Sequence, residues 1–363
     1  MIITLIILAI IMLLIIIFNK RAVPAFLYHQ VNPISNVSPE LFEEHLKVIK
    51  EYKMNTITIS EFYNKEVPTN SILLTFDDGY FDNYKYVFPL LKKYNMKATI
   101  FLNTLYIMDK RETEPEIKDN NTVNLEAMKE YIKSGKATIN QYMSWEEIKE
   151  MYDSSLIDFQ AHSHKHMAMF VDTKIEGLTN KNRMEAPELY LYGELEDNFP
   201  SFPKRGEYTG KAILIKKEFF KIFKEFYEKN IENKVTDKNE ILKKCQEFIA
   251  ENTEYFSDEN EAEYRKRIEE DYLENKKLIE KNLGNQVKFF CWPWGHRSKE
   301  TIKILKELGV VGFISTKKGT NSMKPNWNMI RRIELRKYTP EKFKINLLVA
   351  RNLILGKIYG WIS

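Results

Sequence analysis

The sequence contains little cysteine, since Cys245 and Cys291 are the only two in 363 residues. A framework of several disulfide bridges is therefore excluded, and two free thiols are a simpler interpretation than one bridge. An excess of charge of one sign is also missing, because 55 basic residues stand against 51 acidic ones. Without a basic stripe interleaved with aromatic side chains, the sequence gives no support for nucleic-acid binding.

The sequence also has no internal repeat and no low-complexity linker, but it does have one long apolar run. Residues 1–18 (MIITLIILAIIMLLIIIF) are apolar apart from Thr4, which is just long enough for a membrane-spanning helix. The run has no basic stretch before it and no small-residue cleavage site after it, so a cleaved signal peptide is not indicated. We predict an uncleaved N-terminal transmembrane anchor.

Strand-like and helix-like segments alternate along the rest of the chain, which is typical of a parallel α/β sheet or barrel. The expected strands are 23–31, 71–76, 98–102, 157–160, 287–291, 310–315 and 330–335. The alternation stops over residues 106–143 and 171–258, so we predict one α/β domain, residues 22–345, with two insertions. Residues 346–363 are predicted to form a C-terminal helix that packs on the core. Five aromatic residues between Phe219 and Tyr227 lie at helical spacing, which indicates helix core or, as the alternative, a substrate platform.

Residues 75–79 (TFDDG) end an apolar strand in two adjacent carboxylates, Asp77 and Asp78. Neighbouring side chains on a strand point to opposite faces, so the two acids can share a site only where the strand breaks up. Gly79 permits that break. Such a pair suggests that one acid binds a metal while the other moves a proton, although an ordinary Asp-Gly turn is the alternative.

Three of the six histidines fall within residues 162–166 (HSHKH), directly after an expected strand. His162 and His166 would share a face in a helical turn, as in other two-histidine metal sites. Two imidazoles and a carboxylate leave coordination positions open, which is typical of a catalytic metal rather than a structural one. A solvated polar loop is the alternative interpretation.

These two motifs and residues 291–295 (CWPWG) occur in order, each at the end of an expected strand. Together they resemble the motifs of the polysaccharide deacetylases, the NodB homology group or carbohydrate esterase family four. The resemblance covers about residues 26–170 and 260–335, apart from the insertions. It implies a distorted (β/α)7 barrel and a hydrolase that removes the N-acetyl group of N-acetylhexosamine residues in a cell-surface or extracellular polysaccharide. It also implies a divalent metal cofactor, with zinc as the default.

Carried over residue by residue, the resemblance makes Asp77 the general base and makes Asp78, His162 and His166 the metal ligands. The metal and a backbone N–H near Trp294 would stabilise the oxyanion. Trp294 is also the aromatic side chain that we predict to bind the sugar, in preference to the tryptophans at positions 145 and 292.

One family residue that holds the catalytic aspartate is missing, because Cys291 stands where many members have an arginine. Arg331 or Arg332, in the last expected strand, could take over this role, and we favour Arg332 as the supporting residue.

The late histidine that serves as general acid in the family is missing as well, since no histidine follows His296. The poly-N-acetylglucosamine deacetylases look circularly permuted, with the acid histidine near the N-terminus in a phrase similar to Tyr28-His29. We therefore predict His29 as the general acid, a role that suits the near-neutral pKa of histidine. His296 is the competing candidate, and a structural histidine in the core is the alternative for His29.

Two other functions remain open. A glycosidase could use Asp77 and Asp78, but adjacent acids rarely straddle a glycosidic bond at the roughly 5 Å or more required, and the histidines would have no role. A catalytically inactive glycan-binding or scaffolding protein is the second alternative. A polysaccharide substrate favours a membrane-anchored domain on the external face, whereas Lys20 and Arg21 favour the cytoplasm by the positive-inside rule. We predict the external face.

Overall fold

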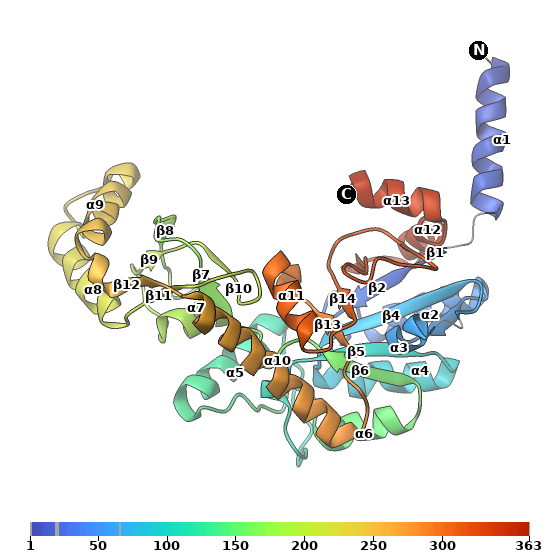
Figure 1. Ribbon diagram of the computed structural model, residues 1–363, viewed down its shortest axis with the longest axis horizontal. Coiled ribbons are helices and arrows are strands. Elements are labelled where there is room, and N and C mark those ends of the chain that lie inside the picture. The colour runs from blue at the N-terminus through green and yellow to red at the C-terminus, as the bar shows by residue number, and fades with distance from the viewer. Residues whose placement is uncertain (1, 19–21, 65–66, 363) are drawn as a thin grey trace.

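The computed structural model describes residues 2–18, 22–64 and 67–362, and its centre is a curled sheet of parallel strands (Figure 1). The order across the sheet is β14 (Gly312–Ile314), β13 (Phe289–Cys291), β6 (Ile157–Ala161), β5 (Ala98–Leu102), β4 (Ser71–Asp78), β2 (Ala25–Tyr28) and β16 (Ile333–Glu334), with β3 (Asn55–Ile57) also paired to β4. All these pairs are parallel, which confirms the predicted α/β class.

Residues 330–334 connect the two edges of this sheet. Ile330 forms an isolated parallel bridge with Ile314 at the end of β14, and three residues later Ile333 pairs with Phe26 of β2. The sheet therefore curls until the segment that forms one edge strand, β16, also contacts β14 at the opposite edge.

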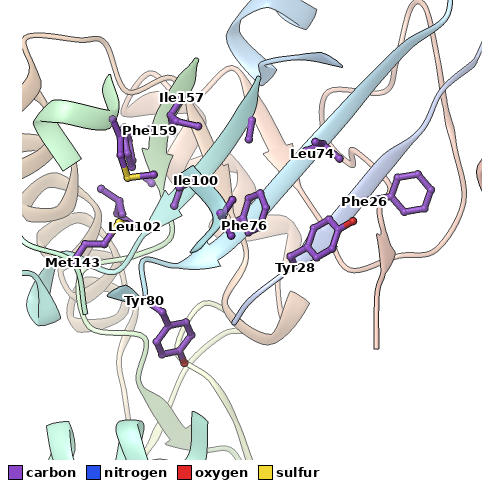
Figure 2. Packing of buried hydrophobic residues seen from close by; sticks show 14 of the residues in the cluster. Phe26, Tyr28, Leu74, Phe76, Tyr80, Ile100, Leu102, Met143, Ile157 and Phe159 are labelled. Carbon is purple, nitrogen blue, oxygen red and sulfur yellow. The ribbon is translucent and has the colours of Figure 1, made fainter. Parts of the chain in front are cut away.

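Successive side chains of each strand point to opposite sides of the sheet, and both faces of this sheet are apolar. On the outer face, Leu74 and Phe76 of β4 lie beside Ile100 of β5 and Phe159 of β6 (Figure 2). This face packs against helices α2 (Pro39–Glu51), α4 (Phe88–Tyr94), α6 (Trp145–Asp153), α10 (Glu261–Leu283), α11 (Lys299–Glu307) and α12 (Pro340–Ala350). The inner face holds a smaller buried cluster that includes Leu73, Phe101 and Cys291. Asp77 continues the inner row, four residues after Leu73.

Two short strands and several short helices complete the domain. The strands β1 (Ala22–Val23) and β15 (Asn321–Ser322) pair antiparallel. The short helices are α3 (Ile59–Tyr63), the π-helical turn η1 (Asn83–Val87), and the 3₁₀ turns η2 (Thr104–Tyr106), η3 (Thr253–Tyr255) and η4 (Pro293–Gly295).

The two predicted insertions contain their own secondary structure. Residues 106–143 include α5 (Asn120–Ser134), which lies against α7 of the second insertion. Residues 171–258 include β8 (Gly177–Leu178), α7 (Ala186–Tyr192), β9 (Pro200–Ser201), β10 (Lys204–Gly206), β11 (Ile213–Ile215), α8 (Glu218–Asn230), α9 (Lys238–Glu251) and β12 (Phe256–Asp258). Strands β10, β11 and β12 form a second, antiparallel sheet with β7 (Ala168–Phe170), and this part lies at one end of the molecule in Figure 1.

The second insertion has an apolar core separate from that of the main sheet. Phe219, Phe220 and Phe223 of α8 are at most 2% exposed and pack in this core. The aromatic residues at helical spacing are therefore helix core and not a substrate platform.

The first helix, α1 (Ile2–Phe18), has 17 residues. At about 1.5 Å per residue it is about 26 Å long, somewhat less than the roughly 30 Å hydrocarbon core of a bilayer. None of the helices in the described ranges combines the length and the apolar character needed to cross a membrane. The prediction of a transmembrane anchor at residues 1–18 is therefore not supported, and Lys20 and Arg21 lie outside the described residues.

The C-terminal segment forms two helices where one was predicted. Helix α12 ends at Ala350, and α13 (Leu353–Ile362) begins three residues later. The break is at Asn352, whose side-chain oxygen accepts hydrogen bonds from the N–H groups of Ile354 and Leu355, both at 3.0 Å. An asparagine that binds backbone N–H groups in this way caps a new helix and does not continue the old one.

Candidate metal centre and active site

The backbone turns sharply at Asp78, the last residue of β4. Asp78 has a φ of 77° and Gly79 a φ of 84°, so both residues are in the left-handed region. Glycine adopts this region readily, but for an aspartate it is uncommon and costs free energy. The break that separates the two acids therefore begins at Asp78 itself, one residue earlier than the glycine from which we predicted it.

Asp78 lies against the two predicted histidines. Its Oδ1 is 3.4 Å from Nε2 of His162, which follows β6 directly, and 3.8 Å from Nε2 of His166. Two ligand atoms bound about 2.1 Å from one tetrahedral ion lie about 3.4 Å apart, so these separations suit a single first-row divalent ion. The donor set of one carboxylate and two imidazoles suits such an ion as well.

Hydrogen bonds orient the candidate ligands. Nδ1 of His162 lies 2.8 Å from the carbonyl oxygen of Cys291, to which it donates when protonated, and this leaves Nε2 toward Asp78. Asn103, the first residue after β5, donates from Nδ2 to Asp78 Oδ1 at 2.9 Å. Sequence reasoning missed Asn103, although its place at a strand end was a signal.

The charges at this site favour a bound cation. Burial lowers the pKa of His166 to about 4, so its imidazole is neutral near pH 7 and able to ligate a metal. Burial also disfavours a charged His162, but its surroundings, Cys291 and Asp77 among them, raise its pKa above the ordinary value. The position between His162 and Asp78 therefore attracts a positive charge, either a proton or a metal ion.

Asp77 lies on the other side of the chain and faces an arginine. Arg332 is fully buried and donates to both carboxylate oxygens of Asp77, from Nη1 at 2.7 Å and from Nη2 at 2.8 Å. Its Nε donates to the carbonyl of Ser315 at 3.0 Å, and Cys291 Sγ lies 3.0 Å from Nη2. Arg331, in contrast, donates to the carbonyl of Lys318.

The ion pair keeps Asp77 ionised. Burial alone would raise the pKa of Asp77, but the charges of Arg332 and His162 together with the hydrogen bonds from Arg332 lower it below its ordinary value. The cysteine at position 291 leaves room for a guanidinium that comes from the last strand segment. Of the two arginines considered from the sequence, Arg332 is the one that contacts Asp77.

The two candidate acids have different surroundings. His29 follows β2 and is partly buried. Burial raises the pKa of Asp77 and Asp78, and the neighbouring Arg332, His162 and His166 lower it, with a smaller lowering from His29. His296 accepts a hydrogen bond at Nδ1 from the N–H of Gly206 at 3.0 Å, so it links the second insertion to the third motif.

Of the three tryptophans considered from the sequence, only Trp294 reaches the surface of the site. It is 39% exposed, has a φ of 52°, and its ring centroid is 4.2 Å from that of His166. Trp292 is fully buried and stacks on Phe313, and Trp145 belongs to the outer core.

Two hollows flank the site. A cavity of about 160 Å³ is lined by Asp78, His166 and Trp294. A cavity of about 410 Å³ with a largely polar lining lies beside His29. Asn120 and Asn121, at the start of α5, line both. Side chains that sequence reasoning missed also line these cavities, namely Tyr80, Tyr106, Tyr142, Asn124, Glu334 and Arg336. The first insertion thus forms the ridge between the two hollows.

The curled parallel sheet and the acids and histidines at its strand ends are the arrangement that the resemblance to deacetylases led us to expect, and comparison with known proteins gives the family. The family model named polysaccharide deacetylase matches residues 64–190 and 227–313, more than half of the chain. The chain therefore belongs to the polysaccharide deacetylase family.

Curated relatives match over shorter stretches. YxkH of Bacillus subtilis, which carries a provisional name as a polysaccharide deacetylase, is 36% identical over 104 residues, covering 26% of this chain and 37% of the relative. The poly-β-1,6-N-acetyl-D-glucosamine N-deacetylase of Staphylococcus aureus is 29% identical over 183 residues, covering 49% of this chain and 52% of the relative. The chain thus spans about half the length, or less, of the curated relatives it matches.

Among solved structures, the deacetylase domain of BpsB from Bordetella bronchiseptica has a similar fold. The TM-score is 0.55 at 17% identity, over 87% of this chain and 97% of that domain. At this identity the similarity shows the fold alone, and it is the curled sheet with helices around it that is shared.

The metal centre can be tested with two neighbouring histidines. We expect the protein to bind one zinc ion and His166→Ala to weaken that binding by more than about 100-fold, because one of three protein ligands is lost. His164→Ala is the matched control, since Nδ1 of His164 lies 2.9 Å from the hydroxyl of Thr104 and belongs to no candidate ligand set. Competition with a chromophoric chelator measures both affinities, and equal losses in the two variants would contradict the assignment.

The ion pair can be tested with two neighbouring arginines. Arg332→Ala leaves a buried carboxylate without its partner, so we expect the free energy of unfolding to fall by about 3–5 kcal/mol. Arg331→Ala should cost about 1 kcal/mol or less, because Arg331 is only partly buried. Urea denaturation measures both. Arg332→Lys, which keeps the charge but loses the two-pronged geometry, should fall between them, and equal stability of all three variants would refute the role of the pair.

Proposed function

We propose that this protein is a metal-dependent N-deacetylase that removes acetyl groups from the N-acetylhexosamine residues of a polysaccharide. The observation that carries the proposal is the division between two adjacent carboxylates. Asp78 lies against His162 and His166, whereas both carboxylate oxygens of Asp77 accept hydrogen bonds from Arg332. Membership of the polysaccharide deacetylase family supports the same activity.

Each residue then has one task. Asp78, His162 and His166 would hold a divalent ion, with zinc as the default, and such an ion supplies Lewis acidity toward a carbonyl and lowers the pKa of water. Asp77, ionised and fixed by Arg332, accepts the proton of the attacking water. His29 donates a proton to the departing amine, and a backbone N–H near Trp294 would stabilise the developing oxyanion.

The positions of the proposed metal ligands and of His29 determine how the acetamide group of the substrate is oriented in the site. The carbonyl of an acetamide must lie at the ligand set, and its nitrogen must lie toward His29. The acetyl group then enters the cavity beside Asp78 and Trp294, and the sugar ring extends toward the polar cavity beside His29. The polar lining of the second cavity suits sugar hydroxyl groups. Because Trp294 lines the first cavity, in this proposal it contacts the acyl side of the substrate and not the sugar ring that we predicted for it from the sequence.

The two alternatives are less well supported. For a glycosidase, Asp77 and Asp78 would have to act together across one bond, but one is paired with an arginine and the other with two histidines. The reason to consider an inactive scaffold was the missing arginine and late histidine, and in this proposal Arg332 and His29 take over their roles. A polysaccharide substrate also favours the external location predicted from the sequence.

Acetate release by the full-length chain tests the proposal. We expect acetate from chitooligosaccharides or poly-N-acetylglucosamine, loss of activity with a chelator and recovery with zinc. Asp77→Asn should retain zinc but lose about 10²- to 10⁴-fold in rate, the usual contribution of a general base. New reducing ends without acetate would indicate a glycosidase, and neither product would indicate a scaffold.

The acid can be assigned by comparing two histidine variants in the same assay. We expect His29→Ala to lower kcat by about 100-fold or more, because the leaving amine loses its proton donor. His296→Ala should cost much less, since His296 serves as an acceptor for a backbone N–H. The opposite order would show that His296 is the acid and that the resemblance to the permuted deacetylases misled the assignment.

A further inference from the structure

Three residues of the second insertion contact three separate parts of the site. Gly206 ends β10, and Glu207 and Tyr208 follow it. We call residues 206–208 the corner. It contacts the metal-ligand loop 162–167, the third motif at residues 291–296, and helix α10. Neither the motifs nor the proposed mechanism gives these residues a role.

Glu207 holds the residue next to the ligand His166. Its N–H donates to the carbonyl of Met167 at 3.1 Å, and its Oε1 accepts from the N–H of Met167 at 3.2 Å. Arg267 of α10 donates to the carbonyl of Glu207 at 2.7 Å, so Glu207 is itself fixed. Met167 is therefore bound through both of its backbone polar groups.

Tyr208 acts on the same loop through Asp271 of α10. The hydroxyl of Tyr208 donates to Asp271 Oδ2 at 2.5 Å. That oxygen also accepts from the N–H of His164 at 2.9 Å, and Oδ1 accepts from the N–H of Lys165 at 3.1 Å. Asp271 is 4% exposed, so its carboxylate depends on these donors and not on water.

The loop needs such support because its backbone is strained. Ser163 has a φ of 80° and His166 a φ of 55°, and neither is a glycine. Residues persist in this region only where the surrounding structure fixes them. The remaining loop donor, the N–H of His166, is bound by the hydroxyl of Ser163 at 2.9 Å. Each backbone N–H from residue 164 to 167 is thus bound by a side-chain oxygen.

The corner also lies directly against the third motif. A Cβ atom added to Gly206 would be 2.7 Å from Cε3 of Trp294 and 3.3 Å from Nδ1 of His296. The backbone of the corner therefore approaches Trp294 as closely as only glycine permits.

We propose that the corner is a positioning element of the metal centre. Through Glu207, and through Tyr208 and Asp271, the second insertion holds the loop in the conformation that brings His166 to Asp78. The inference rests on the metal site of the proposed function but not on the identity of the substrate. It assigns to the insertion a part in metal affinity in addition to any part in choosing the glycan.

Two tyrosines of equal burial allow a matched test. Tyr208→Phe keeps the ring, which packs 4.8 Å from that of Phe290, and removes only the hydrogen bond to Asp271. Tyr272→Phe is the control, because Tyr272 lies on α10 beside Asp271 and also packs on Phe290. Its hydroxyl has no hydrogen-bond partner among the described residues.

We expect Tyr208→Phe to weaken zinc affinity by about 10-fold and Asp271→Asn by about 10- to 100-fold, the range found for residues that orient metal ligands. Tyr272→Phe should leave the affinity unchanged. Chelator competition on the full-length protein gives these values, and the absorption spectrum of the cobalt-loaded protein reports the ligand geometry. The melting temperature of the metal-free protein should fall in Tyr208→Phe but not in Tyr272→Phe, because only Tyr208 donates to the buried carboxylate of Asp271.

A double variant separates positioning from general stability. In a His166→Ala background, Tyr208→Phe should cause no further loss of zinc affinity, since the ligand that the corner positions is gone. A further loss, or unchanged affinity in both Tyr208→Phe and Asp271→Asn, would overturn the proposal. A protein that shows the expected coupling but releases no acetate would support the corner and contradict the proposed function. Acetate release with zinc affinity independent of Tyr208 would do the reverse.

Discussion

The buried ion pair between Asp77 and Arg332 fixes both the proposed base and the closure of the sheet. A charge inside a protein is very unfavourable unless it is paired and hydrogen-bonded, and both partners here are at most 2% exposed. Arg332 meets this requirement through Asp77, the carbonyl of Ser315 and the sulfur of Cys291. Because Arg332 lies in the segment that touches both edges of the sheet, the pair forms only when the sheet is curled. The position proposed for the base therefore depends on the same contact that closes the sheet.

The left-handed backbone at Asp78 has a complementary effect. A regular strand would send Asp78 to the outer face with Leu74 and Phe76, where the apolar core leaves no place for a carboxylate. The turn at Asp78 instead brings its carboxylate to His162 and His166, beside the cavity that contains Trp294. Ser163 and His166 are left-handed as well, so the strain lies at the candidate ligands and in the loop between the two histidines. Such strain is expected where function and not stability determines the backbone.

Local signals made much of this arrangement predictable from the sequence. The strand predicted at 98–102 is observed as Ala98–Leu102, because a short apolar run is a local signal. The capping box that opens α6 is local as well, since Ser144 and Glu147 are only three residues apart. Which of Arg331 and Arg332 contacts Asp77 does not follow from such local signals. That segment is mostly irregular, β16 covers only Ile333–Glu334, and alternation does not fix which side chain points inward. The contacts of residues 206–208 depend on packing between segments that are far apart in the sequence, so no sequence motif predicts them.

The second insertion has an apolar core of its own, but residues 206–208 bind it closely to the rest of the domain. Its apolar core, built around Phe219, Phe220 and Phe223, is separate from the core of the sheet. The corner, in contrast, joins the ligand loop, α10 and Trp294 within a few ångströms. An insertion with its own apolar core is thus also hydrogen-bonded to the loop that carries the proposed metal ligands His162 and His166.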